Sequence, residues 1–95
     1  MISEITIRKV RELAIEDVLS PYVRLSRKGS TLMGLCPFHS EKTGSFAVTP
    51  SKNLFHCFSC NRGGDSITFI MEKENLSFSA AVEFIARNHN IPVEY

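Results

Sequence analysis

Two pairs of metal-binding residue types lie close together in the middle of the chain and constrain its fold more than any other feature. Cys36 and His39 form the first pair, Cys57 and Cys60 form the second, and two residues separate the members of each pair. In a tight backbone turn this gap lets both side chains face one point, and tetrahedral zinc takes four nitrogen or sulfur donors at such spacing. We therefore predict that a hairpin between the pairs brings all four side chains around one zinc ion.

Other chemistries fit this segment less well. A thioredoxin-like motif needs a CxxC that opens a helix, whereas Cys57 and Cys60 follow a strand-like run and lead into Gly63 and Gly64. An iron–sulfur cluster prefers four cysteines. His56 is a spare ligand, but neighbouring residues on a strand point to opposite faces, so we assign Cys57 to the metal and His56 to the surface. A redox switch, in which oxidation of Cys57 and Cys60 ejects the metal, remains an alternative.

The predicted metal site is structural rather than catalytic. Four protein donors close the zinc coordination shell, and a closed shell leaves no position for a reactive water. Glu41 is the only carboxylate within the ligand segment, and without such a water it has nothing to activate. Structural zinc contributes about 10–16 kcal/mol of apparent binding free energy to the folding of small domains. We expect one structural, tetrahedral Zn²⁺ on which the middle of the chain depends, and no catalytic residues in this chain.

The net charge of +1 conceals a segregated distribution. Segments 1–23 and 63–95 are each net acidic, whereas segment 24–62 is strongly basic and has Glu41 as its only acid. The basic residues of segment 24–62 are Arg24, Arg27, Lys28, Lys42, Lys52 and Arg62. Clustered Lys and Arg indicate a polyanionic partner. A solvated basic surface without a partner is equally compatible with the charge alone.

Length and composition narrow the class of protein. Ninety-five residues form one domain, and contents of 43% hydrophobic and 22% charged residues are ordinary for a globular chain. No apolar run approaches the roughly 18 residues that a membrane span needs. Three cysteines are an odd number, which argues against a disulfide framework and for a reducing compartment. We expect a cytoplasmic domain without a membrane partner.

The hydrophobic periodicity changes twice along the chain. Apolar positions in 3–20 recur at helical spacing, with a break possible within 12–16, and Pro21 ends the helical region. Residues 22–62 alternate with turn signals and predict two hairpins. Residues 65–88 return to helical spacing, with Asp65 and Ser77 as N-caps, and 89–95 form an irregular tail that resembles a linker. His89, near the tail, is expected to be an ordinary surface histidine. The fold class is α+β, with a small antiparallel sheet flanked by N-terminal and C-terminal helices.

Several blocks of this sequence resemble one known family. The blocks "GLCPFHSEKTGSFAV", "FHCFSCNRGGDSITFI" and "FSAAVEFIA", together with the upstream "IEDVLSPYVRLSRKGSTLMGL", are similar to the zinc-binding domain at the N-terminus of bacterial DnaG-type DNA primases. The resemblance covers roughly residues 10 to 90, and it places the family's zinc ligands on Cys36, His39, Cys57 and Cys60. The chain departs from the family pattern at Gly44, where proline is usual, and at Ser59, where glycine is usual.

The resemblance implies a single zinc-ribbon domain over residues 1–95 that binds a single-stranded DNA template. In the family this domain helps to choose where priming starts, and a separate polymerase domain makes the RNA primer for DNA replication. On its own the chain should therefore not catalyse. The tail after Ile91 favours a piece of a longer protein. A docking module for a replicative helicase or for the polymerase domain is an alternative, because the acidic C-terminal helices suit a basic partner.

The residues expected to contact nucleic acid are basic or aromatic side chains near the metal ligands. A single strand is held by cations that follow its phosphates and by rings that stack on its bases. The candidates are Lys28, Lys42, Lys52, His56, Arg62 and Phe46. For the cations, plain solvation is an equally good interpretation of the residues themselves. Phe38 and Phe58 flank ligands, and we expect both rings to pack inside the domain.

Overall fold

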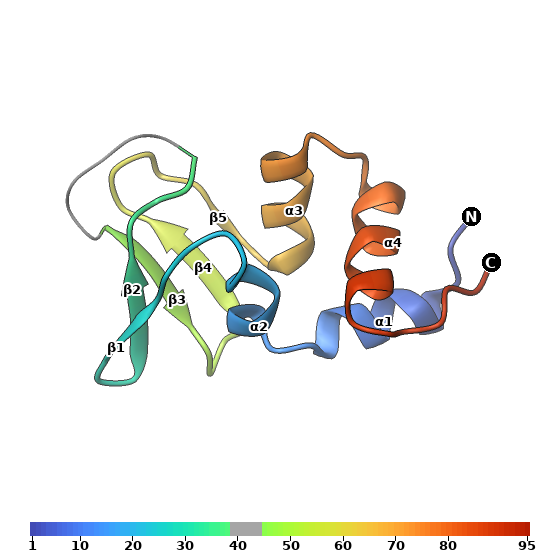
Figure 1. Ribbon diagram of the computed structural model, residues 1–95, viewed down its shortest axis with the longest axis horizontal. Coiled ribbons are helices and arrows are strands. Elements are labelled where there is room, and N and C mark those ends of the chain that lie inside the picture. Colours follow the sequence, from blue (N-terminus) through green and yellow to red (C-terminus); the bar gives the residue numbers. More distant parts are fainter. Residues whose placement is uncertain (39–44) are drawn as a thin grey trace.

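The computed structural model describes residues 1–38 and 45–95 and combines a five-stranded antiparallel sheet with helices from both ends of the chain (Figure 1). This is the α+β architecture expected from the sequence. In chain order the elements are α1 (Glu4–Glu12), α2 (Ile15–Leu19), β1 (Ser26–Lys28), β2 (Thr31–Gly34), β3 (Phe46–Thr49), β4 (Leu54–Cys57), β5 (Gly63–Gly64), α3 (Ser66–Glu74) and α4 (Phe78–Asn88).

The N-terminal helical region breaks into two helices. Ser3 caps α1 by accepting a hydrogen bond from the Thr6 amide at 3.3 Å. Leu13 and Ala14 both adopt extended backbone angles, so the chain turns between α1 and α2, within the stretch where the sequence left a break open. Helix α2 ends at Leu19, two residues before Pro21, as a proline following a helix dictates.

The two expected hairpins are present as β1–β2 and β3–β4, and the structure joins them with β5 into one continuous meander. The order is β1-β2-β3-β4-β5, and every neighbouring pair is antiparallel. Strand β1 begins later than the alternating pattern suggested, at Ser26, and the following turn contains Gly29 with a positive φ of 66°. Strand β5 was not predicted, because its two residues, Gly63 and Gly64, have no side chains to show an alternating pattern.

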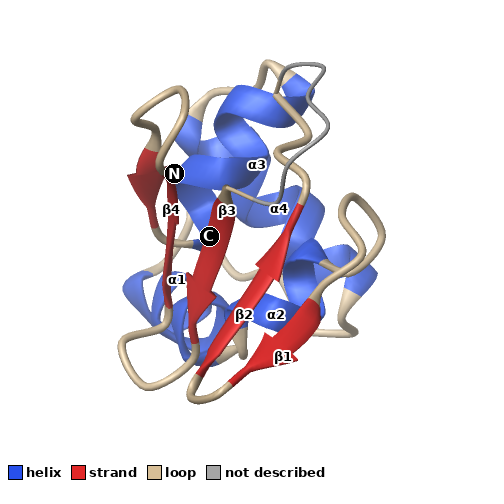
Figure 2. Cartoon of the chain, turned by 90° about the vertical axis from the view of Figure 1, so that its left-hand side faces the viewer, coloured by secondary structure: helices blue, strands red, loops and turns tan. Residues whose placement is uncertain are grey.

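The two faces of the sheet differ. Helices lie behind the sheet in Figure 2, and the covered face carries the buried side chains of Phe46, Val48, Phe55 and Cys57. Phe69 of α3 packs against this face, with its ring centroid 6.0 Å from that of Phe46 and 5.4 Å from that of Phe55. The opposite face, turned toward the viewer in Figure 2, is called here the open face.

The C-terminal helices begin at the predicted caps. The Asp65 carboxylate accepts a hydrogen bond from the Thr68 amide at 2.9 Å, and the Ser77 hydroxyl oxygen accepts one from the Ala80 amide at 3.3 Å. Asn75, in the left-handed conformation, ends α3. Helix α4 buries the apolar stripe that its spacing predicted, namely Ala81, Val82, Ile85 and Ala86.

The tail after α4 is irregular but bonded to the N-terminal region. The Ser3 amide donates to the Glu94 carbonyl at 2.8 Å, and the Glu94 amide donates to the fully buried Thr6 hydroxyl oxygen at 3.0 Å. The two chain ends therefore lie side by side (Figure 1). The expectation of a linker-like tail is wrong for these residues, because they form part of the packed domain. Among the described helices, none has the length and apolar character needed to cross a membrane.

Candidate metal centre and nucleic-acid interface

Three cysteine side chains that are far apart in the sequence meet at one end of the sheet. Cys36 follows β2, Cys57 is the last residue of β4, and Cys60 lies in the turn after β4. Their three Sγ atoms all lie within 4.8 Å of one another. Cys36 and Cys57 are buried, and Cys60 is partly exposed.

The spacing of these sulfurs fits zinc. Two sulfur ligands held 2.3 Å from a tetrahedral ion lie about 3.8 Å apart. The Sγ atoms of Cys36 and Cys60 are separated by 3.8 Å. Thiolates are also among the donors that favour zinc over harder cations. The fourth expected ligand, His39, lies outside the described residues, and so does Lys42.

Backbone hydrogen bonds hold the turn that carries two of the sulfurs. The Cys57 amide donates to the Arg62 carbonyl at 2.8 Å, and the Asn61 amide donates to the Cys57 carbonyl at 2.8 Å. Asn61 takes a left-handed φ of 61°, which asparagine tolerates better than most residues. The Phe58 amide donates to the Ser45 carbonyl at 3.0 Å and ties the turn to the start of β3. The protein backbone thus orients Cys57 and Cys60 toward Cys36.

The environment of Cys36 favours its neutral thiol when no cation is present. Burial raises the pKa of the Cys36 thiol to about 12; the amide of Phe38 opposes this rise, and the Cys57 and Cys60 side chains add to it. Zinc binds thiolates rather than thiols, so metal loading must displace protons from this cluster. Zinc affinity should therefore increase with pH.

Two aromatic residues near the sulfur cluster have the opposite exposure from the one expected. Phe46 is fully buried and lies opposite Cys57 in the β3–β4 register, facing α3. This position is incompatible with the predicted contact with nucleic acid, because Phe46 has no exposed surface. Phe58 was expected to pack inside, yet it is 68% exposed. Because Cys57 points into the core, the next residue emerges on the other side of the strand.

Phe58 and His56 form a pair of rings beside the sulfurs. Their ring centroids are 4.7 Å apart, with an angle of 65° between the planes. His56 lies opposite Ala47 on β3 and Gly63 on β5, so its side chain belongs to the open face, as the alternation from Cys57 predicted. Leu35 and Leu54, with 50% and 42% exposure, add apolar surface near the sheet.

The predicted cations that the structure describes do not share one location. Lys28 at the end of β1 and Lys52 in the β3–β4 turn are exposed. The Arg62 guanidinium instead lies over the Phe38 ring, 4.8 Å from its centroid, and its Nε is 3.9 Å from a carboxylate oxygen of Glu72. Because Phe38 packs on Phe69, Arg62 belongs to the helix-covered side and its charge is partly compensated.

A groove along the β1 side of the sheet combines positive charge with an apolar floor. It has a volume of about 570 Å³ and is lined by Arg24, Ser26, Lys28, Met33, Gly34 and Leu35. The described part of this lining contains two cations and no acid. Arg24 was part of the basic segment but was not among the predicted contacts, since nothing in its sequence neighbourhood marks a groove.

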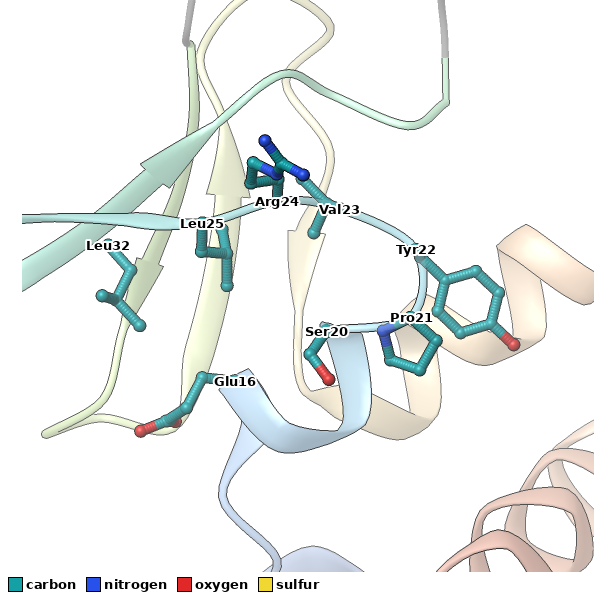
Figure 3. A pocket seen from close by; sticks show the side chains of 8 residues that line it. All are labelled: Glu16, Ser20, Pro21, Tyr22, Val23, Arg24, Leu25 and Leu32. Carbon is teal, nitrogen blue, oxygen red and sulfur yellow. The ribbon is translucent and has the colours of Figure 1, made fainter.

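A second cleft, between α2 and the start of the sheet, has a different character. It has a volume of about 450 Å³ and is lined by Glu16, Ser20, Pro21, Tyr22, Val23, Arg24, Leu25 and Leu32 (Figure 3). Figure 3 shows Glu16 on one side of this cleft and Arg24 on the other. Because it contains both signs of charge, this cleft is a poorer match for a polyanion than the groove beside β1.

Comparison with known proteins agrees with this geometry. Residues 2–95 match the family model described as CHC2 zinc finger. The chain belongs to the CHC2 zinc finger family. It is 47% identical over 96 residues to the DNA primase of Streptomyces coelicolor and 48% identical over 86 residues to that of Geobacillus stearothermophilus. The alignments cover 99% and 90% of this chain but only 15% and 14% of those primases.

A solved structure shares the fold. The Aquifex aeolicus primase structure, which contains zinc-binding and RNA polymerase domains, superimposes with a TM-score of 0.83 at 38% sequence identity. The superposition covers 95% of this chain and 22% of the Aquifex chain. Together with the three clustered sulfurs, these similarities make zinc the structural cofactor of this domain. The chain corresponds to a small part of the length of its primase relatives.

Proposed function

We propose that this chain is the template-binding module of a DNA primase and that it helps to select the site where primer synthesis begins. Cys36, His39, Cys57 and Cys60 hold the zinc, and the open face of the sheet receives single-stranded DNA. The observation that carries this proposal is the pair formed by the exposed Phe58 ring and the partly buried His56 ring, directly beside the zinc-binding turn. The similarity of this chain to primases over nearly its whole length supports the same function.

The zinc would supply a cross-link rather than a reaction. Cys36, which follows β2, and Cys57 and Cys60, on either side of the turn after β4, would hold the ion, and this cross-link would fix the position of the turn relative to the sheet. Phe58 lies between two of the ligands, Cys57 and Cys60, so its ring is presented on a rigid support. A ring that is already ordered loses less conformational entropy when a base stacks on it.

The exposed ring provides a stacking platform. A base stacked on an aromatic side chain contributes about 1–3 kcal/mol, and stacking tolerates any base because each has a π-face. The His56 ring, which lies beside Phe58, would offer a hydrogen-bonding nitrogen next to the stacked base. Choice among template bases would therefore come from His56 rather than from Phe58.

Phosphates would follow the basic groove. One cross-strand row of the register runs from Ser26 through Met33, Ala47 and His56 to Gly63. A single strand laid along this row passes from the ring pair to the groove lined by Arg24 and Lys28. Among the described residues that line the groove there is no acidic side chain to repel the phosphates, and its apolar floor suits an unpaired base.

The proposal extends to the context of the chain. Its primase relatives are several times longer, and the Aquifex structure includes an RNA polymerase domain. We propose that such a domain makes the primer in this protein too, that a replicative helicase is a partner, and that the protein acts in the cytoplasm.

Fluorescence anisotropy of a labelled single-stranded oligonucleotide tests the proposed function. The zinc-loaded chain should bind single strands more tightly than duplex, and binding should weaken with salt as phosphate contacts release counterions. Phe58→Ala should weaken binding about fivefold or more, the loss expected for one stacked base. Phe78→Ala is the matched control, because Phe78 is 37% exposed but lies on α4.

The cations are tested by the salt dependence of the same assay. Lys28→Ala should reduce the slope of log affinity against log salt by about 0.7, the value for one phosphate contact on a single strand. Equal effects of Phe58→Ala and Phe78→Ala would contradict the stacking platform. No binding even at low salt would contradict the template-binding role as a whole.

A protein-docking role is the second candidate and is favoured by a groove on the helical side. Glu4, Ile7, Arg8, Arg11, Glu12 and Phe78 line this groove of about 410 Å³. Ile5, 47% exposed, lies on the same helix, α1. Failure of DNA binding together with capture of the polymerase domain would favour this role. The redox alternative, oxidation of Cys57 and Cys60, requires zinc release under mild oxidant.

A further inference from the structure

Two serine hydroxyl groups lie beside the sulfur of Cys57, and neither zinc ligation nor DNA binding explains them. The Oγ of Ser59 is 3.5 Å from the Cys57 Sγ, and the Oγ of Ser45 is 3.9 Å from it. The two hydroxyl oxygens are only 2.7 Å apart. The three atoms therefore form a hydrogen-bonded triangle at the edge of the metal centre.

The serines reach this sulfur from different parts of the chain. Ser59 lies within the turn between the two ligands Cys57 and Cys60, whereas Ser45 directly precedes β3. The Ser45 carbonyl accepts the Phe58 amide at 3.0 Å, and this bond keeps Ser45 against the turn. A glycine at position 59, which is usual in the family that the sequence resembles, would bring no hydroxyl to this point.

The three distances rank the contacts, and Ser59 is the nearer of the two hydroxyl groups to the Cys57 sulfur. Each hydroxyl has one proton to donate, so only one of the two can donate to the other. Sulfur hydrogen bonds are long, and the 3.5 Å contact of Ser59 is the shorter of the two contacts with Cys57. Donation from Ser45 to Ser59 and from Ser59 to Cys57 follows the two shorter distances, 2.7 Å and 3.5 Å, and is the order that the proposal adopts.

We propose that Ser45 and Ser59 form a hydroxyl relay that supports the Cys57 thiolate as a zinc ligand. A hydrogen bond to a ligand atom fixes its orientation and stabilises its charged form, and such outer partners tune metal affinity. Polarisation by Ser45 strengthens the bond that Ser59 donates. The same bond withdraws charge density from the sulfur and makes it a weaker nucleophile. The relay thus retains zinc and protects Cys57 from electrophiles.

Zinc competition against a chromophoric chelator measures the first consequence. In the 95-residue chain, Ser59→Ala should lower zinc affinity about tenfold, the lower end of the range for outer-shell partners, because the Ser59 hydroxyl is also accessible to water. Ser45→Ala should cause a smaller loss, and that loss should vanish in the Ser59→Ala background. Ser59→Thr, which keeps the hydroxyl, should retain most of the affinity. Ser51→Ala, in the exposed β3–β4 turn, is the matched control.

Alkylation by iodoacetamide measures the second consequence. The Cys57 thiolate attacks the methylene carbon, a carbon–sulfur bond forms, and iodide leaves. Mass spectrometry of the zinc-loaded chain should show faster modification of Cys57 in Ser59→Ala than in the unsubstituted chain. In the cobalt-substituted protein, the thiolate-to-metal charge-transfer band should shift in Ser59→Ala but not in Ser51→Ala.

These readouts separate the relay from a purely structural role. Unchanged zinc affinity and alkylation rate in Ser59→Ala would overturn the proposal. A larger effect of Ser45→Ala, retained in the Ser59→Ala background, would overturn the proposed order of donation. If Ser59→Ala does not fold, Ser59→Gly applies the same test with no side chain at that position. None of these measurements uses DNA, so they stand apart from the proposed template binding.

Discussion

Different interactions stabilise the two ends of the molecule, the helical end and the zinc end. At the helical end, α1, α4 and the tail close around aliphatic side chains such as Val10 and Ile85, and the tail adds backbone bonds to Ser3 and Thr6. At the zinc end the strands have only two to four residues, and three sulfurs meet where the strands stop. Short strands bury little apolar surface, so the zinc end depends on a cross-link where the helical end depends on packing.

Two contacts join these ends. Phe69 of α3 lies against the rings of Phe38, Phe46 and Phe55 on the sheet. Asn53, in the β3–β4 turn, bonds through its side chain to the backbone between α1 and α2. The two ends are therefore stabilised differently but share one hydrophobic core. Variants that weaken one end or the junction can test this difference.

Removal of zinc should affect the two ends unequally and have the largest effect. Structural zinc contributes about 10–16 kcal/mol of apparent binding free energy in small domains. With a chelator, or in Cys57→Ser, amide hydrogen exchange should accelerate most in β3 and β4, while α1 and α4 keep more of their protection. Hydrogen exchange followed by mass spectrometry provides the measurement.

The control for zinc removal is His89→Asn, which changes another metal-binding residue type at the helical end, where His89 caps α4. This variant should keep its zinc and its exchange pattern. Uniform loss of protection along the whole chain would contradict a division into two ends. Full protection of β3 and β4 without zinc would contradict the dependence of the sheet on the metal.

Local signals in the sequence predicted most of the helical end and the metal centre's cysteines. Asp65 and Ser77 were predictable as helix caps. A carboxylate or hydroxyl directly before an apolar stripe of helical spacing can accept a hydrogen bond from an amide of the first turn. The spacing of Cys57 and Cys60 similarly limits the backbone to a tight turn. In these cases the interacting groups are near one another in the sequence.

What the sequence did not predict depends on contacts between distant segments. Phe46 and Phe58 have the same residue type, and only the register with Cys57 decides which ring is buried. The bonds from the Asn53 side chain to the backbone between α1 and α2 also could not be predicted, because asparagine is a common residue in turns. The two glycines of β5 pair with β4 through backbone groups alone, which leave no side-chain pattern.

Loss of the Asn53 side chain should weaken the junction by an intermediate amount. Its carbonyl oxygen accepts the Ile15 amide at 2.8 Å, and its Nδ2 donates to the carbonyls of Leu13 at 3.0 Å and Arg11 at 3.1 Å. Asn53→Gly keeps the positive φ of 56° accessible and removes only these bonds. We expect a loss of about 2–3 kcal/mol in the free energy of unfolding, measured in urea with zinc bound.

Asn90→Gly is the matched control for Asn53, because Asn90 also has a positive φ, of 59°, but lies beyond α4. The control should lose much less stability. Similar losses in both variants would show that the side-chain bonds of Asn53 do not join the ends.

The smallest expected effect concerns a hydrogen bond between the segment leading to the sheet and α3, and it depends on pH. The Tyr22 hydroxyl donates to a Glu74 carboxylate oxygen at 2.7 Å. Burial, followed by the bond to Glu74 and the negative charge of Glu74, raises the pKa of Tyr22 from 10.0 to about 12. The folded state therefore holds this proton more tightly than the unfolded state. The contribution is complete below pH 10 and is lost as the pH rises toward the folded pKa.

Tyr22→Phe should cost about 0.5–1 kcal/mol at neutral pH, because the bond is exposed to solvent. Urea unfolding over an alkaline series should show the difference from the unsubstituted chain shrinking above pH 10. Tyr95→Phe makes the same change at the helical end, where the Tyr95 hydroxyl donates to Glu83 at 3.1 Å. A constant difference for Tyr22→Phe across this series would mean that Glu74 does not hold the Tyr22 proton. The contact between the segment before the sheet and α3 would then rest on the packing of the Tyr22 ring against Phe69, whose centroids are 5.5 Å apart.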